Sequence, residues 1–243
     1  MDESIFHLKY KEDFANDKNF VERLNFASKA SYLDPKSVID REVHHCNHII
    51  YIENNLGELI AFAMYNFEQV DEIEAVYFGL TLCVDQYKAA GFAKYMWQQI
   101  AFEIIKRQDE SGEDFLCWLT TPTPIVFYLS NKFFINTEPS MDGGYSANGK
   151  NLIQKLKKAK YPQFASSENH PFVLRSVAYN TLYSPVERER IAGASHILDI
   201  NCFDKYKVDE TKGDRFLILG YCPGFRELME ERNKMTLNVS FPE

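Results

Sequence analysis

The chain has 243 residues, of which 45% are hydrophobic and 26% charged, and its formal net charge at pH 7 is −8. This composition is that of a globular protein, and the length suits one core with an extension. The negative charge argues against nucleic acid or an anionic membrane surface as a partner, because binding phosphates requires clustered lysine and arginine. It is compatible with a cationic substrate such as an amine, although an acidic balance also serves solubility.

Two features of the sequence bear on its compartment. No run approaches the roughly 20 apolar residues that a membrane span needs, and the first residues lack the basic and then apolar pattern of a signal peptide. The five cysteines are odd in number and contain no CxxC pair: Cys46, Cys83, Cys117, Cys202 and Cys222. Widely spaced free thiols are typical of a reducing compartment, so we expect a cytoplasmic protein.

The beginning of the chain predicts two helices. Asn16 or Asp17 can cap the first, whose apolar residues recur with helical spacing. Asp34 and Pro35 form a second start signal, with proline in the first helical position.

The middle of the chain predicts a sheet and its crossover. Two β-rich runs, 49–52 and 59–65, flank an Asn/Gly turn and indicate a hairpin. The run 73–84 is apolar on both faces, as a central strand is. Residues 92–105 have helical spacing, and residues 114–120 indicate another buried strand.

The composition becomes more polar and glycine-containing after residue 136. We therefore divide the chain into a core, residues 1–137, and a C-terminal extension, residues 138–243. The expected elements beyond the strand at 114–120 are a helix starting at Thr123-Pro124, a basic helix at 151–160, a helix after the capping box at Ser184, a strand at 216–221 and a terminal helix at 225–235.

Residues 84–96 carry the main chemical signal, because they read as a turn from a strand into a helix. The first turn of a helix presents unpaired N–H groups and the positive end of the macrodipole, which suit a phosphate. Lys88 and Lys94 add positive charge. Small residues would let a ligand approach the backbone: Ala89, Ala90, Gly91 and Ala93. A plain strand–helix connection is the alternative, since glycine-rich turns are weak motifs.

This segment resembles the signature of the GNAT superfamily of acyl-CoA N-acyltransferases. The family has valine, a few turn residues, arginine or glutamine, two residues, glycine, one residue, and glycine or alanine. The matching residues are Val84, then Lys88 in the Arg/Gln place, Gly91, and Ala93 in the second glycine place. A second match lies downstream, where Tyr128 takes the place of a family tyrosine, while Thr121 replaces an asparagine and Lys132 a glycine. The hairpin at 51–65 resembles the family's second and third strands.

The resemblance covers about residues 1–137 and implies an α/β (α+β) fold. Its centre would be a GNAT-like mixed, mostly antiparallel sheet flanked by helices, with the extension added. In this family the fourth and fifth strands splay apart, and the pantetheine arm of acetyl-CoA lies between them. The resemblance implies that pantetheine pairs with backbone groups at Leu82, Cys83 and Val84. It places the pyrophosphate against Lys88, Ala89, Ala90, Gly91, Phe92 and Ala93.

The implied reaction is direct attack of an amine on the thioester carbonyl of acetyl-CoA, the co-substrate. A backbone N–H near Leu82 or Val84 would stabilise the oxyanion, and Tyr128 would protonate the leaving thiolate. Glu74, which shares a strand face with Glu72, is our candidate for the general base. A core aromatic is the alternative for Tyr128, and a solvated strand end explains both carboxylates equally well.

No metal is predicted. The run from His44 to His48 looks metal-like, but in a single extended strand its side chains would alternate faces. The lysines of the basic helix indicate a solvated face more than a phosphate contact.

Three functions stay open. The first is acyl transfer to a small-molecule amine or a protein amine. The second is a regulatory module that holds an acyl-CoA without turnover, which a thiol-release assay would distinguish. The third is an α/β protein whose turn binds another phosphate ligand, for which the test is whether strands four and five splay. The extension either completes the sheet through residues 216–221 and folds over the acceptor, or forms a packed subdomain. The oligomeric state is not predicted, and a homodimer stays open.

Overall fold

A computed structural model describes residues 6–88, 90–164, 166–167, 169–195, 198, 200–224 and 228. Its strands are β1 (Phe6–Glu12), β2 (His48–Asn54), β3 (Leu59–Val70), β4 (Ile73–Cys83), β5 (Leu116–Thr121), β6 (Ile135–Glu138), β7 (Ser166–Ser167), β8 (His170–Leu174) and β9 (Arg215–Tyr221). Its α-helices are α1 (Lys18–Ser28), α2 (Pro35–His45), α3 (Phe92–Ser111), α4 (Pro124–Phe133), α5 (Ala147–Lys160), α6 (Pro185–Ser195) and α7 (Cys202–Lys205).

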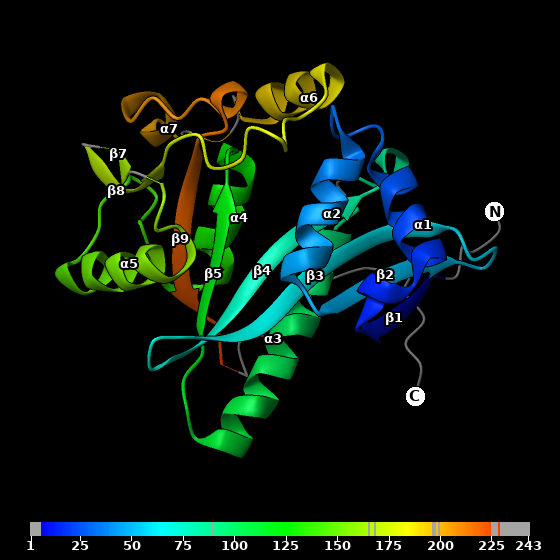
Figure 1. Cartoon of the computed structure of the whole chain (residues 1–243), viewed down its shortest axis with the longest axis horizontal. Helices are drawn as coiled ribbons and strands as arrows, with labels where there is room; N and C mark the ends of the chain where they lie inside the picture. Colours follow the sequence, from blue (N-terminus) through cyan, green and yellow to red (C-terminus); the bar gives the residue numbers. More distant parts are fainter. Residues whose placement is uncertain are drawn as a thin grey trace.

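The strands form one sheet in the order β1-β2-β3-β4-β5-β9-β8-β7, with β6 also paired to β9. Every pairing is antiparallel except that of β4 with β5, which is parallel and needs the crossover helix α3. Helices α1 and α2 cover one face and α3 the other (Figure 1). The expected α/β (α+β) class, with a mixed and mostly antiparallel sheet flanked by helices, is confirmed.

The helix starts follow from local capping chemistry. The Asp17 carboxylate accepts from the Phe20 amide at 3.0 Å and caps α1. Asp34 does the same for α2 through Ser37 N at 3.1 Å, with proline as the next residue. Both predicted starts are confirmed, because an Asp cap satisfies an otherwise unpaired N–H whatever the distant packing.

The histidine run is not one extended strand, and that expectation was wrong. His44 and His45 end α2, whereas His48 begins β2. The chain turns between them because the helix gives way to extended backbone at Cys46. Among the described residues, no group of three or more His, Cys, Asp and Glu side chains could hold a metal ion.

The sheet opens between β4 and β5. The two strands pair at three positions only, the last being Tyr77 with Trp118. Beyond this point β4 stays paired with β3 as far as Cys83, while β5 follows β9 as far as Thr121. The strands therefore splay into a V, as the resemblance implied.

The extension contributes β7, β8 and β9 to the same sheet, so it completes the sheet. The connection from β8 to β9 carries α6 and α7 and contacts the loop between α1 and α2. Tyr183 forms a β-bridge with Tyr32, and Ser184 N donates to Ser31 O at 2.9 Å. Helix α6 thus lies across the top of the molecule, between α2 and α4 (Figure 1).

Some expectations differ from the structure or fall outside it. Strands β1 and β8 were not predicted, and the basic helix begins four residues earlier than expected, at Ala147. The expected terminal helix at 225–235 lies outside the described residues, apart from Leu228. No helix within the described ranges is long and apolar enough to cross a membrane.

Candidate active site

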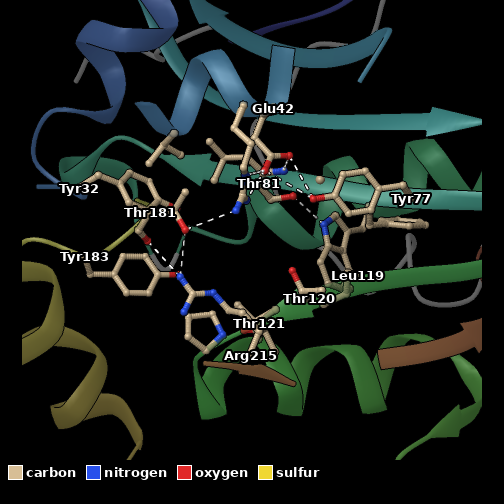
Figure 2. Close-up of a pocket in the computed structure, with 18 residues that line it drawn as sticks. Tyr32, Glu42, Tyr77, Thr81, Leu119, Thr120, Thr121, Thr181, Tyr183 and Arg215 are labelled. Atoms are coloured by element: carbon tan, nitrogen blue, oxygen red, sulfur yellow. Dashed lines mark hydrogen bonds and ion pairs between the residues drawn. The ribbon is translucent and has the colours of Figure 1, made fainter. Parts of the chain in front are cut away.

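The V between β4 and β5 contains a cavity of about 100 Å³ (Figure 2). Polar side chains from three parts of the chain line it: Arg41 and Glu42 of α2, Tyr77 and Thr81 of β4, and Thr181 and Arg215 of the extension. The cavity therefore exists only because the extension closes over the splayed strands.

Glu42 is a buried carboxylate, 1% exposed, at the wall of this cavity. Its Oε1 accepts from Nε of Arg41 at 3.1 Å, and Oε2 accepts from Tyr77 Oη at 3.3 Å. Oε2 also accepts from the amide of Leu80 at 3.2 Å. A buried carboxylate needs such donors, and their presence keeps Glu42 at the cavity wall rather than in solvent.

The Leu80 contact arises from a β-bulge. Ala63 pairs with Thr81 and Tyr65 with Phe78, so two residues of β4, Gly79 and Leu80, oppose one of β3. The bulge takes the Leu80 N–H out of the ladder, and Glu42 accepts it instead. A Cβ on Gly79 would lie 2.7 Å from Glu42 Oε2 and 2.7 Å from Cys46 Sγ, so a larger residue there would displace these side chains.

The end of β4 turns particular backbone groups toward the V. The Val84 N–H donates to Ile60 O at 2.9 Å, so it faces β3. Backbone groups alternate edges along a strand. Leu82 therefore also faces β3, and Thr81 and Cys83 face the side from which β5 has diverged. Of the predicted trio, only Cys83 presents its backbone to the V.

Three tyrosines bring hydroxyl groups to the cavity. Tyr77 contacts Glu42, while Tyr32 stacks on Tyr183 with ring centroids 5.1 Å apart. Burial raises the pKa of all three phenols. They remain protonated at neutral pH and are therefore hydrogen-bond or proton donors.

A larger groove of about 480 Å³ lies between α3 and α4 and adjoins the cavity. Thr81, Trp97 and Val126 line both spaces. Trp97 Nε1 donates to Thr81 Oγ1 at 2.9 Å, and this hydrogen bond holds the two side chains in place between the cavity and the groove. Lys94 and Lys132 line the groove and give it positive charge.

The predicted phosphate turn has the expected backbone. Gly91 is the N-cap of α3 with φ of 88°, a conformation that glycine adopts without strain, and no side chain caps this helix. The first-turn amides at Phe92 and Ala93 therefore lack a side-chain cap, although the Cys83 thiol lies in hydrogen-bonding contact with the Ala93 amide. Burial raises the pKa of that thiol to about 11. Ala90 closes a turn with Tyr87 O, and Ala89 lies outside the described residues.

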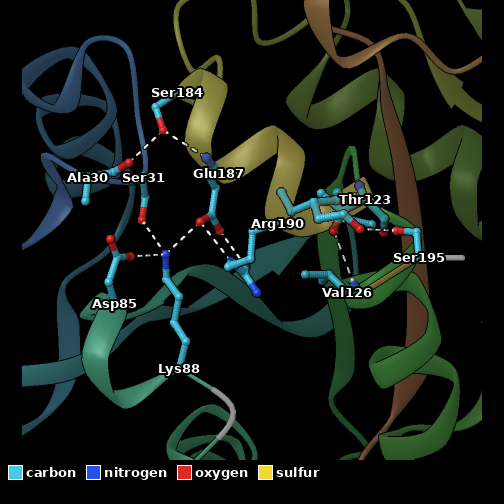
Figure 3. A network of polar contacts seen from close by, with 12 residues as sticks. Ala30, Ser31, Asp85, Lys88, Thr123, Val126, Ser184, Glu187, Arg190 and Ser195 are labelled. Carbon is cyan, nitrogen blue, oxygen red and sulfur yellow. Dashed lines mark hydrogen bonds and ion pairs between the residues drawn. The ribbon is translucent and has the colours of Figure 1, made fainter. Parts of the chain in front are cut away.

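Two members of this turn have other partners. The Lys88 amine binds Glu187 Oε2 at 2.7 Å, Ser31 Oγ at 3.2 Å and the Asp85 carboxylate (Figure 3). It ties the turn to α6 and is not directed at a phosphate. The Phe92 ring is buried, with its centroid 5.1 Å from that of Phe6, so only its backbone is available to a ligand.

The two predicted catalytic side chains do not line the cavity. Tyr128 is two residues after Val126 on α4, about 200° around the helix, and lies under the Lys132 amine at 5.6 Å. Glu74 pairs with Gln69 near the β3–β4 turn, roughly 20 Å along the strand from Thr81 at 3.3 Å per residue. Neither residue lines the cavity or the adjoining groove.

The cavity residues carried a signal that sequence reasoning missed. Glu42 lies four residues after Val38 and three after Ile39, which places a carboxylate on the buried face of α2. Arg215 directly precedes the apolar run of β9. A charged residue in an apolar pattern is the informative one, because burying it without a reason is costly.

Comparisons with known proteins find similarity in structure only. No family model and no curated protein matches the sequence. A ribosomal-protein-alanine N-acetyltransferase from Escherichia coli is 8% identical, with 90% of this chain and 96% of that chain covered and a TM-score of 0.42. A GNAT family N-acetyltransferase from Escherichia coli in complex with CoA is 12% identical over 54% of this chain and 69% of that chain, with a TM-score of 0.37. A ribosomal-protein-alanine N-acetyltransferase from Brucella melitensis is 14% identical over 47% and 78%, with a TM-score of 0.33.

These solved structures are N-acetyltransferases. With TM-scores below 0.5, the likeness decides nothing about the reaction. The chemistry has to come from the chain's own side chains.

Proposed function

We propose that this protein is an acyl-CoA-dependent N-acyltransferase that moves an acetyl group to a primary amine. The observation that carries the proposal is the V between β4 and β5, which joins a cavity containing Glu42 to a groove beside the N-terminus of α3. A binding groove for a long cofactor and an enclosed reaction space are what acyl transfer requires.

The residues around the groove suit acetyl-CoA. The first turn of α3, whose N-cap residue Gly91 has no side chain, offers amide donors to a pyrophosphate, and Lys94 and Lys132 offer counter-charges. The outward-facing backbone of Thr81 and Cys83 offers hydrogen bonds to the pantetheine amides. Lys88, held by two carboxylates, contributes by shaping the turn.

Acyl transfer would proceed within the cavity. Glu42 takes a proton from the acceptor ammonium, and the freed amine attacks the thioester carbonyl. The Thr81 N–H stabilises the oxyanion of the tetrahedral intermediate. A C–N bond forms and the C–S bond breaks, and the thiolate leaves as the thiol with a proton from a tyrosine hydroxyl. That tyrosine then regains a proton from the nitrogen of the new amide, which is the second proton that the acceptor ammonium loses. Glu42 replaces Glu74 as our general base, and the cavity tyrosines replace Tyr128 as the acid.

Cofactor binding is the first test. We expect acetyl-CoA to raise the melting temperature and to bind saturably by calorimetry, while free adenine does neither. Absence of CoA binding would refute the proposal.

The regulatory-module alternative differs in turnover. With acetyl-CoA and a panel of primary amines, an enzyme releases free thiol in proportion to the amine acetylated. A module that binds CoA and releases no thiol with any amine would show that the site is not catalytic.

A further inference from the structure

Arg215 is a buried cation that has no anionic partner among the residues that the structure describes. It is 4% exposed, and its Nη1 and Nη2 atoms donate only to uncharged oxygens of Asp214, Ala178 and Thr181. Within the described residues, no carboxylate lies within salt-bridge distance of it, and no bond from its Nε is found. The Asp214 carboxylate next to it binds Arg175 instead, at 2.5 Å.

A buried guanidinium such as that of Arg215 is stabilised by a nearby negative charge. Desolvation lowers the pKa of the Arg215 guanidinium, which means that the charged form is held at a cost. Other arginines of the extension avoid that cost: Arg175 pairs with Asp214, Arg188 with Glu210 and Arg190 with Glu187. Arg215 alone of these four lines the cavity.

A second guanidinium points at the same place. The Thr181 hydroxyl accepts from Arg215 Nη2 at 3.0 Å and from Arg41 Nη1 at 3.5 Å (Figure 2). Glu42 offsets the charge of Arg41. The cavity wall therefore has one carboxylate and two guanidinium groups, which leaves one positive charge unbalanced.

We propose that Arg215 binds a carboxylate of the acceptor, so that the acceptor is a small amine of the amino-acid class. This inference rests on the acyltransferase function proposed above. A planar carboxylate matches the guanidinium fork, and a single negative charge balances the cavity, whereas a phosphate dianion would overcharge a space that already contains Glu42. The amine of such an acceptor faces Glu42 while its carboxylate faces Arg215.

The size of the cavity limits the acceptor. At roughly 10–15 Å³ per water, about 100 Å³ holds roughly seven to ten waters or a molecule of similar size. Glycine, alanine and β-alanine fit this limit, and long or aromatic amino acids exceed it.

The test compares amines that differ only in the carboxylate. Thiol release from acetyl-CoA is measured with glycine and glycinamide, with alanine and alaninamide, and with β-alanine and its amide. In each pair the amide has the more acidic ammonium group, so at a given pH more of its amine is unprotonated. Intrinsic reactivity with the thioester therefore favours the amide. We expect kcat/KM to be roughly 10- to 100-fold higher for the free acids, the range for losing a hydrogen bond to a charged group.

Variants assign this preference to Arg215. R215M should lower the ratio of kcat/KM for the acids to that for the amides to about one, and R215K should retain part of the preference. If R215M does not fold, R215K provides the comparison. The control R107M removes an arginine on the surface of α3 that pairs with Glu103, and it should keep the full preference.

Several results would overturn the inference. The inference is wrong if the amides have the same kcat/KM as the acids. It is also wrong if R215M lowers kcat/KM equally for acids and amides, because an equal loss indicates a structural role. A preference for aminomethylphosphonate over glycine would refute the single-charge assignment.

If CoA binds but no amine is acetylated, the carboxylate site is tested instead by the binding of N-acetylated products to the complex of the protein with CoA. N-acetylglycine should then bind at least tenfold more tightly than N-acetylglycinamide by calorimetry, and equal binding refutes the carboxylate site. Failure of CoA itself to bind refutes the acyltransferase proposal instead.

Discussion

Replacing Glu42 by glutamine tests the centre of the proposed site. E42Q keeps the shape of the side chain and its contact with the Leu80 amide but removes the charge and the base. Without a general base, kcat/KM should fall about 100- to 10,000-fold. Acetyl-CoA binding should change little, because Glu42 lies in the cavity and not in the adjoining groove.

The same change also costs stability, and the structure sets its size. Arg41 loses its carboxylate, but its side chain is 36% exposed, so water replaces part of the interaction. The expected loss is about 1–3 kcal/mol, the range for an imperfectly satisfied buried group. For a chain of this length that lowers the melting temperature by about 2–4 °C per kcal/mol.

A matched variant separates the two effects. Glu53 is a carboxylate whose side chain is only 5% exposed, and it pairs with Lys9 and Arg23 on β1 and α1, away from the cavity. E53Q should lose similar stability by calorimetry and retain wild-type kcat. The reasoning is refuted if E42Q keeps kcat/KM within threefold of wild type, or if E53Q loses as much activity as E42Q.

Three further predictions follow from the turns and from α6. G91A places alanine at φ of 88°, which should cost about 1–2 kcal/mol of stability and weaken CoA binding measured by calorimetry. The control G112A places alanine at φ of 74°, which should cost as much stability and leave CoA binding unchanged. G79A drives a Cβ to within 2.7 Å of the buried carboxylate, so we expect a loss of about 1–3 kcal/mol and a lower kcat, and an unchanged kcat would argue against the bulge contact. Burial would raise the pKa of Glu187, but its bonds to Arg190 and Lys88 outweigh this and lower the pKa below the ordinary 4.5. Its contribution of about 1 kcal/mol is therefore present at neutral pH and lost as pH falls below 4.5, so the unfolding free energies of wild type and E187Q should converge in acid and differ at pH 7.

The parts of the fold that the sequence predicted are those specified locally. Asp17 and Asp34 satisfy the amides of the residues that follow them, and Gly91 supplies a backbone angle that the helix start requires. Such signals need no knowledge of distant packing. The splay was also expected, but only through the resemblance, because nothing in the residues of β4 and β5 states where their pairing stops.

The residues of the proposed site could not be predicted in the same way, because they are assembled from distant segments. Lys88 is bound by Glu187, which is 99 residues away in sequence. Glu42 and Arg215 meet one cavity only after β9 has joined the sheet. Tyr128 matched a motif position, but a shift of two residues on a helix moves a side chain to another face.

The ion pair between Lys88 and Glu187 has a consequence for the order of events. Lys88 belongs to the turn proposed for the pyrophosphate, and Glu187 lies four residues after Tyr183, which lines the cavity proposed for the acceptor. One contact therefore joins the two proposed sites. We expect nucleotide binding at the turn to position Glu187 and the cavity wall next to it, which gives an ordered kinetic scheme with the nucleotide first. The acceptor would then complete a ternary complex whose entrance the nucleotide has already shaped.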